Sequence, residues 1–356
     1  MGVIGADVVV VGGGLAGTAA AVLLARAGAS VTLLERGPPA DPVDVGVVLE
    51  PDGLAVLAGL GLSSVRRRGC PLDDRLGVRR SVLHEALLGA VMAQPGIACR
   101  PAAEVTGCRP DGVVESVWHG RPSTIRADLV LGADGIASVV RRSGDFAPRV
   151  RRRRAGYVRG LVSGRGLAPA EYWTALGLFG SVAVDPQTVS FYAAAHARPV
   201  RDARDRGALA RRWDAVLPPA GEALRRAEDL VRDDAVRIDC RRWHDRRLVL
   251  VGDAAHATTP ASGPDVSSAL VDAAVLAAEL AHTRATADGL RRYALRRAPA
   301  VQARQDRADR VVHMSRLRRP LARIGPDVGG PSSMSRPSGK QEDPAQLLEL
   351  VGSLGH

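Results

Sequence analysis

A chain of 356 residues, of which 46% are hydrophobic and 24% charged, is long for a single core and predicts two lobes. Its longest apolar runs, such as residues 8–11, are short and interrupted by glycine, which excludes stable insertion into a membrane. The net charge of +11 comes almost entirely from arginine, since Lys340 is the only lysine, and the arginine runs match no nucleic-acid-binding motif, so we expect no nucleic-acid partner.

The arginine runs at 66–68 and 151–154 have two interpretations, namely solvated surface or an anion-attracting rim for a phosphate-bearing cofactor. The cysteines are scattered and none has CxxC spacing, which predicts a reducing, cytoplasmic location without disulfides or a metal site. No basic segment precedes the first apolar run, which argues against a signal peptide.

The first 36 residues have the pattern of a βαβ unit. Residues 6–11 predict a strand, and residues 15–27 predict an apolar helix that stops at Gly28. Residues 30–34 predict a second strand, which ends in Glu35. The turn between the first strand and the helix is therefore placed where a Rossmann-type ligand would bind.

That turn reads GGGLAG and contains a GxGxxG motif. Gly12 permits the tight turn, Gly14 lets the backbone approach a pyrophosphate, and Gly17 lets the helix pack closely on the strand. The helix N-terminus offers unpaired N–H groups and a positive dipole to phosphates. Because Glu35 can accept hydrogen bonds from a ribose diol, the unit predicts dinucleotide binding.

The remaining elements are predicted from apolar spacing and turn residues. Further helices are expected at 53–60, 80–92, 266–282, 286–318 and 344–351, buried strands at 128–131 and 247–251, an antiparallel hairpin of 172–184 with 189–195, and disorder at 325–344. The hairpin predicts a second, sheet-based lobe, and the strand at 247–251 returns the chain to the first lobe.

Two further glycine/aspartate sequences stand at predicted strand ends, GADGIASVVR at 132–141 and GDAAHATTP at 252–260. Three such sites along one extended ligand suit a long dinucleotide better than a mononucleotide. With Arg80 in RSVLHEAL and with Leu290-Tyr293-Arg297 in the late helix, this set resembles the group A flavoprotein monooxygenases, the family of p-hydroxybenzoate hydroxylase. The resemblance covers about residues 5–318.

The resemblance implies an α/β fold with two domains. A Rossmann-like FAD-binding domain, discontinuous over residues 1–158 and 245–320, would carry a second, mainly antiparallel β-sheet substrate domain over residues 159–244. Residues 321–356 would form a partly disordered tail.

The resemblance also implies FAD contacts from each strand end. The residues that would hold FAD are Gly12, Gly14, Leu15, Ala16 and Gly17 at the pyrophosphate, Glu35 and Arg36 at the adenosine, Val105 at the adenine through its backbone, Arg80 and Asp253 at the flavin and its ribityl phosphate, and Pro260 and Gly263 at the isoalloxazine. Asp134 and Arg141 belong to a motif implicated in both FAD and NAD(P)H contacts. His256 is either a general base or a structural part of its motif, and we favour the structural role.

The family's chemistry belongs to its cofactor. NAD(P)H reduces FAD, O2 adds to give a C4a-hydroperoxide, and one oxygen passes to an electron-rich small molecule, here of an aromatic or polyketide-like class. Epoxidation, Baeyer–Villiger insertion and dehydrogenation stay open, as do a non-redox enzyme that keeps FAD as a scaffold and a redox-silent binding protein. Phe179 and Tyr192 on the predicted hairpin either line the substrate pocket or pack in the core. The substrate, the choice of NADH or NADPH and the oligomeric state stay open.

The sequence departs from the family pattern after GDAAHATTP at 252–260, which resembles the family's GD motif. The expected second glycine is replaced by Asp265 and the expected asparagine by Ser267. In the family this helix N-terminus faces the flavin pyrimidine and stabilises negative charge on the reduced ring. Asp265 either brings like charge to that ring or turns to solvent as an ordinary helix N-cap.

Overall fold

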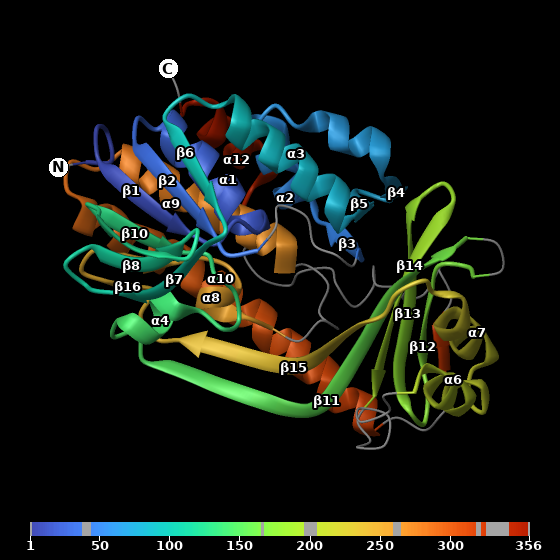
Figure 1. The fold of residues 1–356 in the computed structure, drawn as a ribbon. Helices are drawn as coiled ribbons and strands as arrows, with labels where there is room; N and C mark the ends of the chain where they lie inside the picture. Colours follow the sequence, from blue (N-terminus) through green and yellow to red (C-terminus); the bar gives the residue numbers. More distant parts are fainter. Residues whose placement is uncertain are drawn as a thin grey trace.

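The structure is a computed structural model that describes residues 2–37, 44–164, 167–195, 205–258, 265–317, 322–324 and 342–354. Its first lobe is built on a mostly parallel sheet (Figure 1). From one edge to the other, the strands are β16 (His244–Asp245), β17 (Leu248–Leu250), β10 (Leu129–Gly132), β1 (Asp7–Val11), β2 (Ser30–Glu35) and β6 (Ile97–Pro101). All neighbours pair in parallel except β16 with β17.

The parallel arrangement decides where the motifs meet. The unbroken valine run of β1 is buried, as expected for a strand covered on both faces of a parallel sheet. Because β1, β2, β10 and β17 point the same way, the residues that follow them lie at one edge of the sheet. The glycine turn, Glu35, Asp134 and Gly252 therefore converge, although they are more than 200 residues apart in the chain at the extremes.

Helices cover this sheet. Their bounds are α1 (Leu15–Arg26), α2 (Pro51–Gly59), α3 (Arg80–Ala93), α9 (Asp265–Ala281), α10 (Thr286–Leu317) and α12 (Pro344–Gly352), with the short helices α4 (Val139–Ser143), α8 (Asp253–His256) and the 3-10 turn η1 (Ser63–Arg68). α1 packs against α3 and α9, while α2 and α12 pack on α9. α1 stops where the sequence predicts, because Gly28 adopts φ +90°.

Two small antiparallel sheets complete the first lobe. One contains β3 (Gly46–Leu49), β5 (Arg75–Arg79) and β4 (Cys70–Leu72), and the other contains β7 (Ala103–Cys108), β8 (Val113–Trp118) and β9 (Arg121–Arg126). β5 also contacts the second lobe through β13. The sheet of β3, β5 and β4 therefore links the first lobe to the second.

The second lobe is an antiparallel sheet in the order β15-β11-β14-β13-β12-β18. Its strands are β15 (Val231–Cys240), β11 (Pro148–Ser163), β14 (Thr188–Ala195), β13 (Gly177–Asp185), β12 (Ala170–Trp173) and β18 (Ala322–Ile324). Figure 1 shows α6 (Arg206–Asp214) and α7 (Pro218–Arg226) against its outer face. That face buries Phe179, Phe191 and Trp213 in one apolar cluster.

The sheet lobe confirms the predicted hairpin and corrects one of its strands. β13 pairs with β14 as expected. The predicted strand at 172–184 is wrong, however, because it is two strands, β12 and β13, joined by a tight turn between Thr174 and Gly177. Apolar residues continue through the turn at Leu176 and Leu178, and so the sequence pattern does not show the break.

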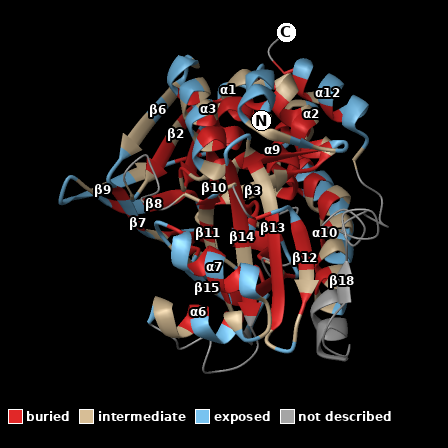
Figure 2. Ribbon diagram, turned by 90° about the vertical axis from the view of Figure 1, so that its right-hand side faces the viewer, coloured by how far each residue is buried: buried red, intermediate tan, exposed pale blue. Residues whose placement is uncertain are grey.

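Burial follows this two-lobed arrangement. Figure 2 shows buried residues along the sheets of both lobes and exposed residues on the outer surfaces of helices such as α6 and α7. Nearly all of the first lobe's buried apolar residues belong to one cluster. None of the helices in the described ranges is both long and apolar enough to span a bilayer.

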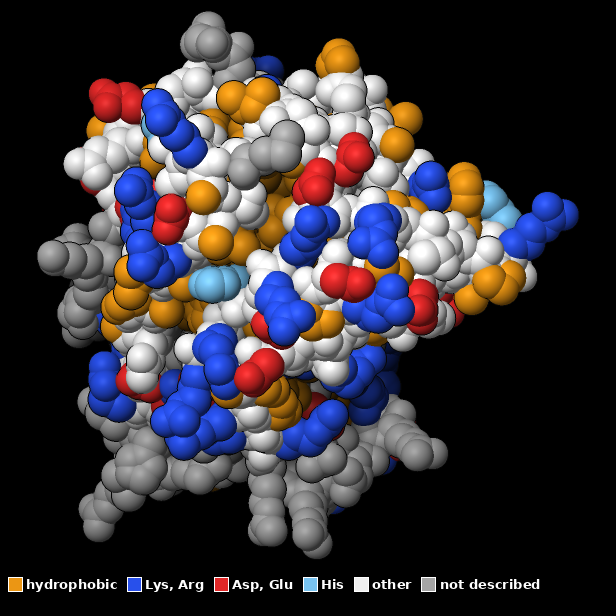
Figure 3. Space-filling model, turned by 90° about the vertical axis from the view of Figure 1, so that its left-hand side faces the viewer, with side chains coloured by type: hydrophobic (Ala, Val, Ile, Leu, Met, Phe, Trp, Pro, Cys, Tyr) orange, Lys and Arg blue, Asp and Glu red, His pale blue; other side chains and the backbone are white. Residues whose placement is uncertain are grey.

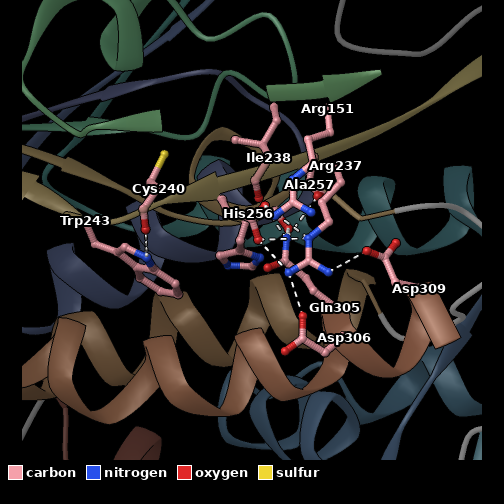
Figure 4. A network of polar contacts seen from close by, with 11 residues as sticks. Arg151, Arg237, Ile238, Cys240, Trp243, His256, Ala257, Gln305, Asp306 and Asp309 are labelled. Atoms are coloured by element: carbon pink, nitrogen blue, oxygen red, sulfur yellow. Dashed lines mark hydrogen bonds and ion pairs between the residues drawn. The ribbon is translucent and has the colours of Figure 1, made fainter. Parts of the chain in front are cut away.

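Strands β11 and β15 run from one lobe to the other, and a buried polar network fixes β15 to α10 (Figure 4). Arg237 on β15 is 3% exposed and pairs with Asp306 and Asp309 of α10 at 2.8 Å each. The Gln305 amide donates to the carbonyls of Ile238, His256 and Ala257 at 2.8–3.1 Å. Strand β15, which leads from the sheet lobe back to the first lobe, is thereby held to the same helix as the carbonyls of His256 and Ala257.

The excess arginine charge is distributed among acidic side chains over most of the face in Figure 3, with a denser basic group toward its lower edge. The described residues include exposed ion pairs such as Arg247 with Asp128 and Arg242 with Asp145. Mixed charge of this kind supports the solvated-surface interpretation. Within the described part of the chain, no three His, Cys, Asp or Glu side chains are grouped so that they could hold a metal ion.

Candidate functional site

Two of the three motif glycines, Gly12 and Gly17, are tightly packed against protein atoms, and the third, Gly14, borders open space. Gly12 adopts φ +103°, and a Cβ there would lie 2.5 Å from the Ala133 carbonyl oxygen. A Cβ on Gly17 would lie 1.9 Å from the Gly12 carbonyl oxygen. A Cβ on Gly14, in contrast, would meet nothing within 4 Å. Gly12 and Gly17 therefore serve the close fit of α1 on the sheet, whereas the space beside Gly14 is available to a ligand.

The first turn of α1 supplies donors to that space. The first hydrogen bond within the helix runs from the Thr18 N–H to the Gly14 carbonyl at 2.9 Å. The N–H groups of Leu15, Ala16 and Gly17 come before it, so helical geometry gives them no acceptor inside the helix. Such N–H groups, with the helix dipole behind them, are suited to a phosphate.

Glu35 is fixed at the end of β2 by backbone donors. Its Oε2 accepts from the Gly13 N–H and its Oε1 from the Gly37 N–H, both at 2.6 Å. A carboxylate has about four acceptor sites, so lone pairs are left for ribose hydroxyls. Arg36 beside it is exposed. This geometry is compatible with the predicted adenosine contact.

α3 presents two basic side chains toward the same region. The Arg80 N–H donates to the Val45 carbonyl at 2.8 Å where the helix begins, and His84 lies one turn further. His84 Nε2 donates to the Gly13 carbonyl at 2.6 Å. Sequence motifs do not single out His84; its only signal is the i,i+4 spacing from Arg80.

Asp253 stands at the start of α8, directly after Gly252 with φ +56°. Asp253 is exposed, yet the surrounding protein raises the pKa of its carboxyl by desolvation. The charges of His256, Arg159 and Arg80 act in the opposite direction. Arg159 belongs to β11 of the sheet lobe, and so Asp253 faces basic groups from both lobes.

A buried network lies beneath Asp253. Asp272 of α9 accepts hydrogen bonds from His256 Nε2 at 2.5 Å, Arg297 Nε at 2.8 Å and the Gly252 N–H at 3.1 Å. Trp243 stacks on His256 with ring centroids 4.9 Å apart. These contacts support the structural role that we favour for His256, because its side chain is 6% exposed and committed to Asp272.

The GADGIASVVR motif at 132–141 makes most of its hydrogen bonds to backbone groups. Asp134 Oδ2 accepts from the N–H groups of Val139 and Val140 at 2.6 and 3.2 Å, which caps α4. Its Oδ1 is buried without a hydrogen-bond partner among the described residues. Arg141 is 6% exposed and donates to the Ala254 and Ile136 carbonyls. Arg141 therefore ties α4 to α8, and Oδ1 of Asp134 is the atom left for a ligand.

The other predicted residues are placed less completely. Val105 lies on β7, which contacts β2 near the Glu35 end, and its side chain is buried. Pro260 and Gly263 lie outside the described residues. α9 begins at Asp265, one residue before the predicted start.

Ser267, the other departure from the family pattern, has a clear structural role. Its side chain is fully buried, and its Oγ accepts from the Glu50 N–H at 2.8 Å. A Cβ on Gly53 would lie 2.5 Å from that Oγ. The small serine thus lets α2 approach the first turn of α9 and satisfies an N–H at the start of α2.

The sheet lobe contributes the side chains that face the first lobe. Ser190 Oγ accepts from the Gly46 N–H of β3 at 3.0 Å. Arg159 pairs with Asp233 and lies opposite Tyr192 in the β11–β14 register. Phe179 points to the other face, where it stacks on Phe191, so the core interpretation holds for Phe179. Tyr192 lies on the face between the lobes.

Glu50 is a buried carboxyl whose titration should control stability. It is 4% exposed, and burial raises its pKa to about 7, although Arg75 opposes this from 3.9 Å. A folded-state pKa above the usual 4.5 means that the stability contributed by protonated Glu50 is fully present below pH 4.5. That contribution is lost as the pH rises through 7.

We expect Glu50→Gln to remove the loss of stability that wild type shows as the pH rises through 7. Between pH 4.5 and pH 8, the free energy of unfolding of the variant should rise by about 3 kcal/mol relative to wild type. Urea titrations of the wild type and the variant at both pH values measure the difference. Glu85→Gln, on a side chain that is 69% exposed, is the control and should show no such change. An equal difference at both pH values would show that folding does not raise the pKa of Glu50.

Comparisons with known proteins agree with this geometry. A family model described as an FAD binding domain matches residues 83–308, and one described as an FAD dependent oxidoreductase matches residues 7–41. The chain is 32% identical to 3-amino-4-hydroxybenzoate 2-monooxygenase of Streptomyces cremeus, over 97% of this chain and 94% of that protein. It is 29% identical to 6-methylpretetramide 4-monooxygenase of Streptomyces rimosus, over 92% and 88% of the two chains.

Solved structures show the same fold. The tetrameric form of 2-methyl-3-hydroxypyridine-5-carboxylic acid oxygenase superimposes with a TM-score of 0.78 at 24% identity, over 87% of this chain and 92% of that one. Tetracycline destructase Tet(55) has a TM-score of 0.71 at 19% identity, over 99% and 97% of the two chains. With a glycine turn open at Gly14, a GD motif at a strand end and these relatives, the chain belongs to the FAD-dependent group A flavoprotein monooxygenases.

Proposed function

We propose that this protein uses FAD, NAD(P)H and O2 to hydroxylate an aromatic or polyketide-like small molecule. The observation that carries the proposal is that the open side of Gly14, the buried Oδ1 of Asp134 and the exposed Asp253 lie together beside the carboxyl ends of the parallel strands. Ligands of open α/β sheets bind at that edge, and sites between domains are common. The names of the two Streptomyces relatives, one for an aminohydroxybenzoate and one for a methylpretetramide, support the substrate class.

The residues present fit FAD. The open side of Gly14 and the N–H groups at the start of α1 would hold the pyrophosphate, and the spare lone pairs of Glu35 would hold the adenosine ribose. The unpartnered Oδ1 of Asp134 and the exposed carboxylate of Asp253 are free to accept from cofactor hydroxyls.

The remaining assignments rest on the family resemblance. Arg36 and Val105 are proposed at the adenosine end, and Pro260 and Gly263 at the isoalloxazine. We propose the domain division 1–158 with 245–320 for FAD and 159–244 for substrate, and a cytoplasmic location, on the sequence grounds given above.

The chain's own part in the reaction is binding and orientation. When bound, FAD accepts reducing equivalents from NAD(P)H and activates O2 for transfer of one oxygen atom. Asp253 is held by a turn whose Gly252 N–H is fixed by Asp272, so its carboxylate is oriented before the cofactor arrives. Arg159 and Tyr192 present polar groups from the sheet toward the side where substrate would bind.

The test is oxidation of NADH or NADPH with and without a candidate substrate, here 3-amino-4-hydroxybenzoate and 6-methylpretetramide. We expect substrate-dependent NAD(P)H and O2 consumption and a product that carries one atom from 18O2. The structure of that product separates hydroxylation from epoxidation and Baeyer–Villiger insertion. Conversion without NAD(P)H consumption would favour a non-redox enzyme instead.

The flavin potential of Asp265 variants is a second measurement. If its carboxylate lies within about 6 Å of the reduced ring, Coulomb's law at an effective dielectric of about 20 gives roughly 3 kcal/mol of repulsion. For a two-electron couple this lowers the potential by roughly 60 mV. Asp265→Asn should then raise the flavin potential by that amount and speed reduction by NAD(P)H. A solvent-facing N-cap predicts an unchanged potential in Asp265→Asn and a small stability loss in Asp265→Gly, and spectroelectrochemical titration of the three proteins separates the alternatives.

A further inference from the structure

The sheet of the second lobe has one face toward α6 and α7 and one face toward the first lobe. In β14, Phe191 and its alternate neighbours pack in the cluster with α6 and α7. Ser190 and Tyr192 therefore point the other way. Ser190 confirms this direction, since its Oγ contacts the Gly46 N–H of β3 in the first lobe. Arg159 lies directly opposite Tyr192 in the register, and its charge lowers the pKa of the Asp253 carboxyl in the first lobe against the effect of desolvation. Tyr192 thus lies on the face of the sheet that is turned to the FAD-binding lobe.

Tyr192 is held by a buried carboxylate on the same face. Its hydroxyl donates to Glu171 Oε2 at 3.0 Å. Glu171 is 5% exposed, whereas Tyr192 is only partly buried. The two residues belong to β14 and β12, and β13 runs between them. The tyrosine ring must therefore cross a strand to reach its partner.

Gly180 of β13 makes that crossing possible. It pairs with Tyr192 on one side and with Glu171 on the other. A Cβ on Gly180 would lie 2.3 Å from Cζ of the Tyr192 ring and 2.4 Å from its hydroxyl oxygen. The ring lies over a position where only hydrogen is tolerated, so the Glu171–Gly180–Tyr192 arrangement is a defined unit of three adjacent strands.

We propose that Tyr192, oriented by Glu171, forms a hydrogen-bond-accepting subsite that selects substrates with a hydroxyl or amino donor on the ring. An ionised carboxylate only accepts, so the tyrosine proton is committed to Glu171. The phenol oxygen then has only its lone pairs free. It can therefore accept a hydrogen bond from a ligand but cannot donate one. This inference rests on the proposed function and adds the chemical character of the substrate group that meets the sheet.

The experiment uses FAD-saturated protein at pH 8.5, where Glu171, whose pKa burial raises to about 7, is mostly ionised. The probes are 2-naphthol and 2-methoxynaphthalene, which share one aromatic body but differ in whether the oxygen can donate. Their dissociation constants are read from the change in flavin absorbance. Wild type should bind 2-naphthol about tenfold more tightly than the ether, as expected for one net hydrogen bond.

Three variants separate this role from general packing. Tyr192→Phe should reduce the preference to less than about twofold, because the acceptor is gone. Glu171→Gln should weaken or reverse it, because an amide can donate to the tyrosine oxygen and release the tyrosine proton toward the ligand. Tyr172→Phe is the matched control, since Tyr172 lies beside Phe179 near the α6–α7 cluster, and it should keep the wild-type preference.

Equal binding of the two probes by wild type, binding of neither, or an unchanged preference in Tyr192→Phe would each overturn the subsite. A yellow protein that consumes NAD(P)H with substrate but gives one of these results overturns only this inference. Loss of FAD binding and of NAD(P)H oxidation in wild type would instead overturn the proposed function.

Discussion

Purified Gly14→Val protein should be folded but colourless. Gly14 already has φ −72° and ψ −173°, a conformation open to any residue, and a side chain there meets nothing within 4 Å. Valine can therefore be accommodated in the protein, at the modest cost of a poorer helix N-cap. Its methyl groups would occupy the space in which the backbone must approach a pyrophosphate. We expect at least a hundredfold weaker FAD binding, or about 3 kcal/mol.

Gly17→Ala is the contrasting variant. Its Cβ would lie 1.9 Å from the Gly12 carbonyl oxygen, so α1 must move away from the sheet and the fold itself should be destabilised. Thermal unfolding by circular dichroism, together with the flavin absorbance of each purified protein, distinguishes the two effects. Extraction of the wild-type cofactor should yield FAD, because FMN lacks the pyrophosphate and adenosine that Gly14 and Glu35 serve. A yellow Gly14→Val protein, or FMN in the extract, would contradict this assignment.

The parts of the fold that were predictable from the sequence are those with local causes. The βαβ unit is set by a valine strand, an alanine- and leucine-rich helix and Gly28, all within residues 7–35. The GD motif can likewise be recognised from the apolar strand that ends just before Gly252. In each case the residues that decide the structure are neighbours in the chain.

The rest depends on contacts between distant segments. Apolar residues continue across the break between β12 and β13, so the sequence pattern of one strand conceals two. The electrostatic effect of Arg159 on Asp253 depends on how the sheet lobe packs on the first lobe, which no local spacing encodes. Glu171 is a lone acid in a strand, and only the register across Gly180 brings it to Tyr192. Ser267 appears as a departure from a motif until its contact with the Glu50 N–H is known.

Asp272→Ala should be the most destabilising substitution in the first lobe's polar core. Asp272 is fully buried and accepts from His256, Arg297 and the Gly252 N–H. Its removal leaves the guanidinium of Arg297, which is 1% exposed, without its carboxylate. Breaking a buried pair from one side costs about 3–5 kcal/mol. Asp288→Ala, in an exposed pair with Arg291, is the control and should cost less than about 1 kcal/mol.

The same residue predicts an acid dependence. Burial alone would raise the pKa of Asp272, but the charges and hydrogen bonds of His256 and Arg297 overcome this and hold the pKa at about 2. Because the folded-state pKa is depressed, this stability is present above pH 3.8 and is lost as the pH falls through 2. The stability advantage of wild type over Asp272→Ala should therefore shrink by about 2 kcal/mol across that range.

Flavin content links this network to function. Gly252 has φ +56° and directly precedes Asp253, so loss of the Asp272 acceptor frees the turn that orients the Asp253 carboxylate. Asp272→Ala should lose FAD as well as stability, whereas Arg297→Ala, which leaves the Gly252 contact in place, should lose stability with less effect on FAD affinity. Urea unfolding and FAD titration of both variants and of the double variant measure the two effects separately. If both single variants lose FAD in proportion to their stability, the network acts only through the core, and the orientation of Asp253 does not depend on Asp272.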